Sequence, residues 1–405
     1  MSAVAPLEAD ATGTRPLAIL AAARALPFHS IGGMQAIAWD VLKGIAQRGH
    51  AVTVLTTTIR GCDHARFEHD GVTVVPLAGT VPERYSSAFW HASREHVVRR
   101  EQRFDAVLSV SAAAAGLVPL KRTSLAVPWV LQVHGSAWAE ALTKWRTTRP
   151  LEWMKSARNV YWLAKDARLY KEFDHLVFVG DALARQFAAA PLRWMTRGIA
   201  RATIVNGIDT DVFRFDAADR ARVRKRLAFA PDDVVAVFAA RLHPRKGAAE
   251  ALRALAVLRA SEPKYKLLIV GEGTEGMALR RLAAELACSD SVAFAGAVPR
   301  QAMPELLSAG NVFVFPALGR EGLPLNVLEA LSVGLPCVCA DGLRETFGTL
   351  GRIAYAPPRD ARALAAAIDA SALRTAPRHT LLPHEYSLRR CVDGYESVIR
   401  RSAGL

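Results

Sequence analysis

The sequence is poor in cysteine and has no long apolar run. Its 405 residues include only five cysteines, which are scattered and lack zinc-ligand spacing. A disulfide-bonded scaffold is therefore not expected, and a reducing compartment such as the cytoplasm fits best. No segment reaches the ~18 apolar residues that a membrane-spanning helix needs. Internal repeats and low-complexity tracts are also absent, so the pattern is that of an ordinary globular chain.

Negative charge is scarce relative to positive charge. The chain carries 52 Lys and Arg against 38 Asp and Glu, which gives a formal net charge of +14. About half of the residues are apolar, which permits a large core and excludes global disorder. The excess of positive charge leaves three classes of partner open: nucleic acid, an anionic membrane and an anionic small substrate.

Short apolar runs alternate with helical periodicities along almost the whole chain. One series of expected strands begins at Leu17–Ala23, and a second begins at Val234–Ala239. Strands joined through helices need crossover connections, which favours parallel sheets covered by helices. The other expected strands are Val52–Thr56, Val72–Pro76, Ala106–Ser109, Trp129–Val133, Leu176–Val179, Lys266–Val270, Val292–Ala295, Val312–Phe315 and Pro336–Ala340.

These two series predict two open α/β domains. We expect a disordered lead-in over 1–14, an N-terminal domain over 15–203, a C-terminal domain over 204–382, and a helical segment over 383–405 that returns toward the first domain. Parallel sheets bind ligands beyond the carboxyl ends of their strands, so functional residues are expected in those loops. If the two domains face each other, the active site lies in an interdomain cleft.

Two loops at expected strand ends carry glycines or cations. Gly32 and Gly33 lie between the first strand and the first helix, where backbone N–H groups can approach a phosphate; an ordinary tight turn is the alternative. Arg241 and Lys246 follow the strand Val234–Ala239. A guanidinium fork beside a point charge suits a diphosphate, and the alternative is a solvated basic loop.

The segment Gly271–Gly276 matches the dinucleotide-binding pattern Gly-x-Gly-x-x-Gly. It follows an expected strand, opens an expected helix and has Asp290 about 20 residues further on. The pattern normally opens its domain, whereas one strand and one helix come first here. We therefore favour a glycine turn near a ligand phosphate or sugar, and keep NAD binding as the alternative.

Two carboxylates flank an expected helix start. Pro324 suits the first helical turn, which puts Glu321 in the preceding loop and Glu329 about one turn into the helix. A carboxylate in the loop can accept hydrogen bonds from sugar hydroxyls, and a carboxylate on the helix can accept them from ribose hydroxyls. The alternative is that the helix dipole alone favours a carboxylate at the helix start. His134 ends the strand Trp129–Val133, a place from which it can donate a hydrogen bond to a substrate or leaving group.

An aromatic and cationic stretch runs from Trp138 to Lys171. It holds four tryptophans and eight Lys or Arg, opposed by only three acidic residues. Such a stretch suits an anionic bilayer, and it also suits a nucleic-acid backbone with base stacking. The alternative is a helical hairpin whose tryptophans pack inward.

Together these residues resemble the retaining glycosyltransferases of family 4, which have the GT-B fold. The resemblance covers about Leu17–Val398. It is carried by Gly32-Gly33, Arg48-Gly49-His50, Asn206–Asp209, Arg241…Lys246-Gly247, Gly271–Gly273, Gly296–Val298 and the Glu321/Glu329 pair. It implies an α/β fold of two facing Rossmann-like parallel-sheet domains. Pro316-Ala317 and Val179-Gly180 depart from the usual Pro-Ser and Ser of the family, which leaves the acceptor and the local sugar geometry open.

The resemblance also implies roles for individual residues. Arg241 and Lys246 would bind the diphosphate and take the place of a metal ion, Glu329 would hold the ribose, and Glu321 would hold the transferred sugar beside His134. The catalytic residues would thus be His134, Arg241, Lys246 and Glu321. The other donor-binding residues would be Gly32, Gly33, Gly271, Gly273, Ala297, Val298, Gly322, Leu323, Pro324 and Leu325. No metal and no other cofactor is implied, since the nucleotide-sugar is a co-substrate.

The implied activity is transfer of a hexosyl group, with retention, from a nucleoside-diphosphate sugar to a cell-envelope glycan or lipid-linked acceptor. The expected location is cytoplasmic, peripheral at the inner face of the cell membrane. Alternatives are a basic nucleic-acid-binding protein, an oxidoreductase, and a GT-B-like sugar-nucleotide epimerase or phosphorylase. Nucleic acid is not an expected partner, because no known binding motif appears and the charge is spread over two α/β domains.

Overall fold

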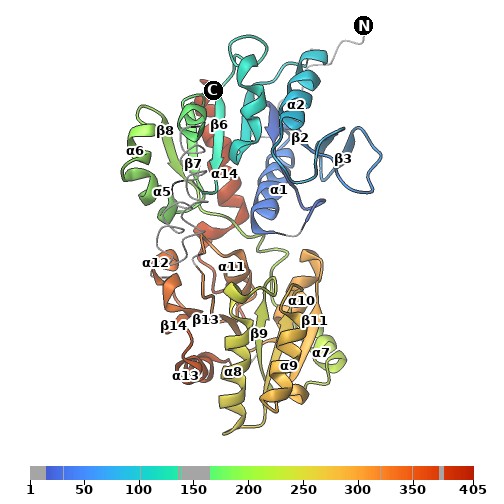
Figure 1. Cartoon of the computed structure of the whole chain (residues 1–405), viewed down its shortest axis with the longest axis vertical. Helices are drawn as coiled ribbons and strands as arrows, with labels where there is room; N and C mark the ends of the chain where they lie inside the picture. The colour runs from blue at the N-terminus through green and yellow to red at the C-terminus, as the bar shows by residue number, and fades with distance from the viewer. Residues whose placement is uncertain are drawn as a thin grey trace, which may run out of the picture. The chain divides into compact units, whose positions relative to one another are not determined.

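The protein consists of two compact units. A computed structural model describes residues 15–30, 32–100, 102–135, 138, 165–319, 321–348, 350–373 and 378–405. Unit 1 comprises Met1–Asn206 and Leu388–Leu405, and unit 2 comprises Gly207–Ser387 (Figure 1). The borders expected from the sequence fall a few residues earlier in each case. The predicted lead-in and most of the Trp138–Lys171 stretch lie outside the described residues.

Unit 1 is built on an eight-stranded sheet with the order β3-β4-β2-β1-β5-β6-β7-β8. Every neighbouring pair is parallel except β3 and β4. The strands are β1 (Ala18–Ala22), β2 (Ala51–Thr57), β3 (Phe67–His69), β4 (Val72–Leu77), β5 (Ala106–Val110), β6 (Trp129–Val133), β7 (His175–Phe178) and β8 (Ala200–Thr203).

Helices cover both faces of this sheet. Ile19 and Ala21 of β1 pack toward α1 and α14, whereas Leu20 and Ala22 pack toward α2 and η1. This alternation divides the core of unit 1 into two layers. The unit 1 helices that lie wholly within the described residues are α1 (Gly33–Ala46), α2 (Ser87–Arg99), η1 (Ser111–Leu120), α5 (Asp181–Ala188), α6 (Leu192–Met195) and α14 (Leu388–Ser402).

Unit 2 contains a six-stranded, all-parallel sheet with the order β11-β10-β9-β12-β13-β14. Its strands are β9 (Val234–Ala239), β10 (Tyr265–Val270), β11 (Val292–Gly296), β12 (Val312–Phe315), β13 (Cys337–Ala340) and β14 (Ile353–Ala356). Strands that are buried on both faces consist of continuous apolar residues. The positions of β9, β10 and β12 could therefore be predicted from the sequence.

The sheet of unit 2 is flanked by α-helices and short 3₁₀ turns. They are α7 (Ala217–Arg226), η2 (Pro244–Lys246), α8 (Ala248–Arg259), α9 (Gly276–Glu285), η3 (Ser289–Ser291), η4 (Arg300–Ala302), α10 (Met303–Ala309), α11 (Leu325–Ser332), η5 (Asp341–Leu343), α12 (Arg344–Phe347), α13 (Ala361–Ser371) and η6 (His384–Tyr386). None of the helices in the described ranges is both long enough and apolar enough to cross a bilayer.

All eleven strands expected from apolar runs are present. The unit 2 sheet is parallel as predicted, and the unit 1 sheet is parallel except for the edge strand β3, which pairs antiparallel with β4. Three further strands were missed, namely β3, β8 and β14. Each has three or four residues and is largely half-buried or exposed. β3 and β8 contain polar residues and give no apolar run, whereas β14 is an apolar run of only four residues. All five cysteines carry free thiols, in agreement with the absence of a disulfide scaffold.

Candidate functional site

The carboxyl edge of the unit 2 sheet gathers most of the predicted donor-binding residues. From β9 the chain proceeds to β10 and β11 on one side, and from β12 to β13 and β14 on the other. The strand order therefore reverses between β9 and β12, the place where open parallel sheets bind ligands. The loops after β9, β10 and β12 carry the predicted cations, glycines and Glu321, respectively.

Lys246 and Glu321 form an ion pair at this edge. The Lys246 ammonium donates to both carboxylate oxygens of Glu321 at 2.8 Å, and it also lies 5.7 Å from the centre of the Phe315 ring. Both side chains are about one-fifth exposed, so the pair is accessible to a ligand. The sequence placed these two residues in one site but did not predict that they contact each other.

Backbone contacts join the loops that carry this pair. The Arg245 carbonyl accepts hydrogen bonds from the N–H groups of Leu318 and Gly319, at 2.8 and 3.2 Å. Gly247 has φ +84°, and a Cβ there would lie 2.1 Å from the Pro316 carbonyl oxygen. Only glycine allows this approach, so the loop after β9 and the loop after β12 are fixed against each other.

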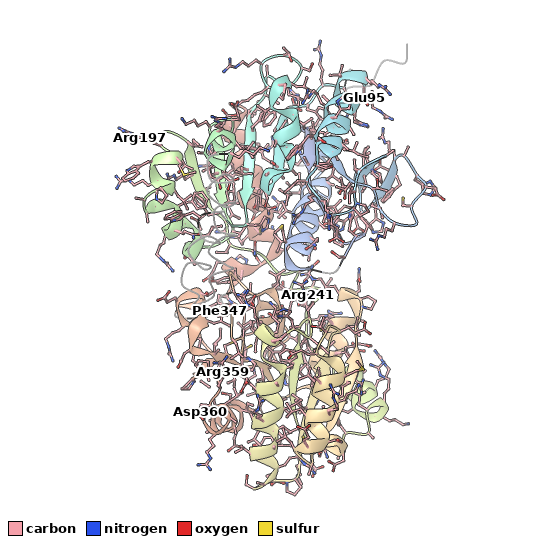
Figure 2. All side chains as sticks on the ribbon, in the orientation of Figure 1. Glu95, Arg197, Arg241, Phe347, Arg359 and Asp360 are labelled. Atoms are coloured by element: carbon pink, nitrogen blue, oxygen red, sulfur yellow. The ribbon has the colours of Figure 1, made fainter. Side chains whose placement is uncertain are left out.

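Arg241 lies at the start of the loop after β9 and is exposed (Figure 2). Among the described residues, its guanidinium has no hydrogen-bond or ion-pair partner. Glu321 compensates the charge of Lys246, whereas the exposed Arg241 and Arg245 of the same loop have no ion-pair partner among the described residues. A cation placed this way attracts an anionic ligand group such as a phosphate.

Glu329 is held by Arg300, a residue that the sequence analysis missed. Glu329 is buried in α11, and its Oε1 accepts a hydrogen bond from the Arg300 Nε at 2.8 Å. The Arg300 guanidinium also lies 5.1 Å from the centre of the Phe213 ring. Arg300 follows β11 by four residues, so a cation just after a strand end was the signal that could have identified it.

The glycine loop after β10 packs against the loop after β9. The Gly271 N–H donates to the Gly296 carbonyl at 2.7 Å, and the Leu242 N–H donates to the Glu272 carbonyl at 2.8 Å. A Cβ on Gly273 would lie 2.2 Å from the Leu242 carbonyl oxygen. Close backbone packing therefore accounts for the glycines without a dinucleotide.

The geometry argues against the NAD interpretation of this loop. Asp290, the acid at the spacing expected for a ribose ligand, lies in η3 before β11, while Gly271 follows β10. Since β10 and β11 are parallel, these residues are at opposite edges of the sheet. Asp290 instead makes a two-point ion pair with Arg259, at 2.8 and 3.0 Å.

Replacing Gly271 by alanine is expected to lower the free energy of unfolding by about 2–4 kcal/mol. The residue has φ +129°, and a Cβ would lie 2.0 Å from the Ala240 carbonyl oxygen. Denaturant unfolding of Gly322→Ala is the matched control, since nothing lies within 4 Å of a Cβ at Gly322. Equal stability of the two variants would contradict the packing argument.

The remaining predicted donor-binding residues lie at the same edge. Ala297 and Val298 follow β11, and Gly322 and Leu323 precede α11. Pro324 is the N-cap of α11 and Leu325 its first residue, so Pro324 lies just before the first turn rather than within it. The Asn326 side-chain amide donates to the Ala239 carbonyl at 2.8 Å, which ties this helix start to the end of β9.

In unit 1, Gly32 and Gly33 lie at the start of α1. Gly32 is the N-cap, and no side chain caps the helix there. The first backbone N–H groups of a helix have no intrahelical acceptor, so they are available to a ligand. A Cβ on Gly32 would lie 2.4 Å from the Gln35 Oε1, which shows that the Gln35 side chain folds back over this glycine.

His134 follows β6 at the carboxyl edge of the unit 1 sheet. Burial lowers the pKa of its imidazole to about 4, so the ring is neutral at pH 7. Within the described residues, its buried Nε2 has no hydrogen-bond partner. A neutral ring with one open nitrogen can exchange a hydrogen bond with a substrate atom.

Comparison with known proteins gives two family matches. Residues 219–378 match the family described as glycosyl transferases group 1, and residues 32–193 match the glycosyl transferase 4-like domain. The chain belongs to the group 1 glycosyltransferases of the GT-B fold, family 4-like. The family suggested by the sequence motifs and the expected fold class are thereby confirmed.

One curated relative is a GDP-mannose-dependent alpha-(1-6)-phosphatidylinositol monomannoside mannosyltransferase of Mycolicibacterium smegmatis. It is 34% identical over 187 residues, which are 44% of this chain and 48% of the relative. The match thus spans about half the length of that relative, and less of several others.

Solved structures share the fold over nearly the whole chain. Sucrose-phosphate synthase from Thermosynechococcus elongatus aligns with a TM-score of 0.71 at 20% identity, covering 96% of this glycosyltransferase and 98% of that chain. Anabaena Alr3699/HepE in complex with UDP and glucose aligns with a TM-score of 0.64 at 17% identity, covering 95% of each chain. These likenesses concern the fold alone.

Proposed function

We propose that this protein transfers a hexosyl group, with retention, from a nucleoside-diphosphate sugar to a cell-envelope glycan or lipid-linked acceptor. The observation that carries the proposal is the convergence of Arg241, Lys246 and Glu321 on one sheet edge in a group 1 glycosyltransferase. Two cations and a carboxylate are the groups needed to bind a diphosphate beside a sugar.

In the proposed reaction, the bond between the sugar anomeric carbon and the diphosphate oxygen breaks. The acceptor hydroxyl attacks the same face, and its proton passes to the departing diphosphate. Arg241 and Lys246 stabilise the negative charge that develops on that diphosphate, the task that a metal ion performs elsewhere. We propose that the enzyme needs neither a metal ion nor another cofactor.

The Lys246–Glu321 ion pair gives these residues a specific order of action. An incoming diphosphate competes with Glu321 for the Lys246 ammonium, which lies 2.8 Å from both carboxylate oxygens. Once Lys246 turns to the phosphate, the Glu321 carboxylate is free to accept hydrogen bonds from sugar hydroxyls. The backbone of Gly322, Leu323, Pro324 and Leu325 lies directly after it.

The other predicted residues complete the proposed site. Glu329 accepts hydrogen bonds from the ribose, the backbone of Ala297 and Val298 contacts the base, and Gly271 and Gly273 border the donor. On the acceptor side, Gly32 and Gly33 offer backbone N–H groups. The neutral His134 hydrogen-bonds the sugar or the leaving phosphate through its buried Nε2.

A thermal-shift screen with nucleotide-sugars is the first test. A ligand that binds only the folded protein stabilises it by about 2.7 kcal/mol at 100 times its Kd. We expect at least one uridine or guanosine diphosphate sugar to raise the unfolding temperature. Product analysis with and without acceptor then separates transfer from epimerase and phosphorylase chemistry, and no response to any nucleotide-sugar would refute the proposal.

Replacing Glu329 by glutamine is expected to weaken donor binding about 10- to 100-fold. The change removes a charge-assisted hydrogen bond, worth about 1.5–3 kcal/mol. The control is Glu305→Gln, because Glu305 also pairs with arginines, Arg222 and Arg226, but on α10 rather than in the donor loops. Donor titration should separate the two variants, and unchanged affinity in Glu329→Gln would remove this residue from the site.

We further propose that the enzyme acts in the cytoplasm, at the inner face of the cell membrane. A lipid-linked acceptor would lie in that membrane, and the net charge of +14 suits an anionic surface. The segment predicted to dock, Trp138–Lys171, lies mostly outside the described residues.

A further inference from the structure

A second aromatic and cationic surface lies within the described part of unit 1. It comprises α5, α6 and β8, and β8 is the last strand of the sheet, so one of its sides is an open edge. Between Asp181 and Asp209 the chain has four arginines and no acidic residue or lysine. These arginines are Arg185, Arg193, Arg197 and Arg201.

Trp194 is the most unusual side chain of this surface. Its exposed fraction is 71%, whereas Trp39 and Trp129 are buried and Trp90 and Trp138 are half-buried. It is therefore the one exposed tryptophan among the five that the structure describes. A single exposed apolar side chain is common on protein surfaces, so the indole gains meaning only together with the charges beside it.

Two exposed arginines flank the indole. Arg193 and Arg197 are both exposed, and within the described residues neither has an ion-pair partner. Figure 2 shows Arg197 at the outer side of its unit. An indole between two uncompensated guanidinium groups matches the chemistry of a membrane interface, where tryptophan lies at the level of the phosphates.

The backbone beneath this surface is fixed. Arg201 donates to the Thr196 carbonyl and hydroxyl oxygens at 3.3 and 2.6 Å, and to the Phe187 carbonyl at 3.4 Å. Leu192 and Phe187 are fully buried below α6 and α5. Arg201 thus holds the ends of both helices, so Trp194 is presented on a rigid support.

The neighbouring elements add positive charge. The Ser402 hydroxyl at the end of α14 contacts the His175 Nδ1 at 2.8 Å, and His175 pairs with Ala200 of β8. Arg401, the residue before Ser402, is exposed and interacts electrostatically with His175. Two acids border this surface: Asp174, before β7, is engaged by Lys121 and by the Trp129 N–H, and the exposed Asp181 is the first residue of α5.

We propose that Arg193, Trp194 and Arg197 form a docking surface for an anionic lipid bilayer. This inference rests on the proposed function in one respect, because a lipid-linked acceptor lies in such a bilayer. The indole inserts among the headgroups, and the two guanidinium groups bind lipid phosphates. A rigid indole with two flanking cations lacks the several aromatic platforms along a groove with which proteins bind single-stranded nucleic acid, and therefore favours a bilayer over such a strand.

Vesicle flotation of the full chain tests this surface. The wild type is expected to float with vesicles containing one-quarter phosphatidylglycerol and not with pure phosphatidylcholine. Each Arg→Ala change should lower the partition coefficient of the protein onto the vesicles about fivefold, since each cation near an anionic surface changes that coefficient by about this factor. Trp194→Ala should lower it similarly while leaving the unfolding temperature unchanged, because the side chain is exposed.

Matched controls come from unit 2. Met277 has an exposed fraction of 79%, and Arg281 and Arg362 are exposed, so Met277→Ala and Arg281→Ala/Arg362→Ala remove the same kinds of groups elsewhere. These controls should float like the wild type. The proposal would be overturned if Trp194→Ala and Arg193→Ala/Arg197→Ala floated as well as the wild type. It would also be overturned if the wild type did not float but bound RNA or DNA, and these variants lost that binding.

The outcome is separable from that of the proposed function. Arg193→Ala/Arg197→Ala should keep the full thermal shift with the nucleotide-sugar, because neither residue is in the donor site. Thermal shift without flotation of the wild type would refute the docking surface alone. Flotation without any response to nucleotide-sugars would refute the proposed activity alone.

Discussion

Replacing Lys246 by alanine is expected to lower kcat for glycosyl transfer about 100- to 1000-fold. Removal of one preorganised group that stabilises developing charge has an effect of this size. Lys246 is the cation fixed at the sheet edge by the loop after β9, where Gly247 allows contact with Pro316. Steady-state rates with the donor found by thermal shift provide the measurement.

Loss of stability does not account for such an effect. The Lys246–Glu321 pair is about one-fifth exposed on both sides, and pairs of this kind contribute about 1 kcal/mol or less. Lys264→Ala is the control. Lys264, just before β10, forms an ion pair with Asp232, just before β9, so this pair lies at the amino edge of the same sheet. Near wild-type transfer by Lys246→Ala would refute the proposed role and the donor site with it.

The fold was predictable where burial determines the sequence. Strands such as β9 and β12 are buried on both faces and consist of apolar residues, so their ends were identified to the residue. The missed strand β8 has the pattern Ala200-Arg201-Ala202-Thr203 and lies at an open edge. Its pairing with β7 is a tertiary contact that leaves no periodicity in the sequence.

The candidate site was predictable in its members but not in its contacts. Strand ends are readable, so Arg241, Lys246 and Glu321 could be placed at one edge. That Lys246 pairs with Glu321, 75 residues away, and Arg300 with Glu329, 29 residues away, depends on how the loops close. The dinucleotide interpretation does not fit the sheet, which places Asp290 at the edge opposite Gly271.

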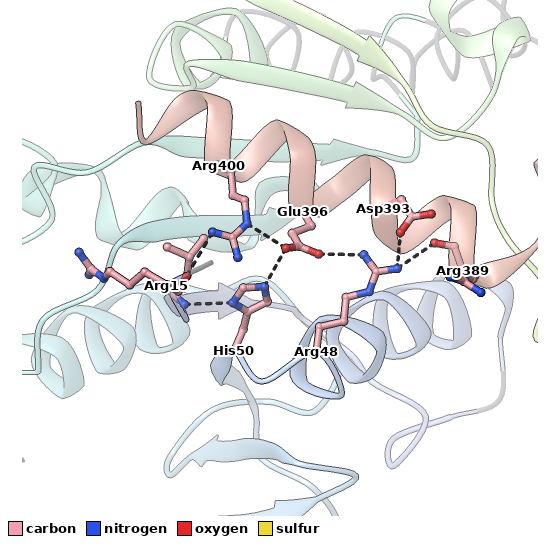
Figure 3. Close-up of polar contacts among 8 residues, drawn as sticks. Arg15, Arg48, His50, Arg389, Asp393, Glu396 and Arg400 are labelled. Atoms are coloured by element: carbon pink, nitrogen blue, oxygen red, sulfur yellow. Dashed lines mark hydrogen bonds and ion pairs between the residues drawn. The ribbon is translucent and has the colours of Figure 1, made fainter. Parts of the chain in front are cut away.

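A charged cluster inside unit 1 fixes the C-terminal helix (Figure 3). Glu396 of α14 accepts from Arg400 at 2.8 Å and from Arg48 at 2.8 Å, and its other contact is the His50 Nε2 at 3.3 Å. His50 is buried, and its Nδ1 accepts from the Leu17 N–H at 3.0 Å. The proton of a neutral His50 is therefore on Nε2, facing Glu396.

These contacts lower the pKa of Glu396. Burial acts to raise it, but the hydrogen bonds from Arg400, Arg48 and His50 outweigh burial and bring the pKa to about 2 from an ordinary 4.5. A carboxyl group whose pKa is lower in the folded state stabilises the fold above its unfolded pKa. The contribution is complete above pH 4.5 and is lost as the pH falls toward 2.

Glu396→Gln is accordingly expected to reduce the free energy of unfolding by about 2–3 kcal/mol at pH 7. The difference from the wild type should shrink between pH 4.5 and 2, because the wild-type carboxyl group becomes protonated there. The control is Glu95→Gln, which breaks an exposed pair with Arg99 on α2 and should cost about 0.5 kcal/mol or less. A constant difference across this pH range would contradict the assignment.

The position of Glu396 gives this variant a second expected effect. The chain leaves unit 1 after Asn206 and re-enters it at Leu388, so unit 2 is connected to unit 1 at both of its ends. The second connection depends on the docking of α14 against α1, where Gly44 allows close contact with Val392. Glu396→Gln should therefore speed proteolysis within α14 at pH 7. Because the donor loops are in unit 2, the thermal shift with the nucleotide-sugar should remain.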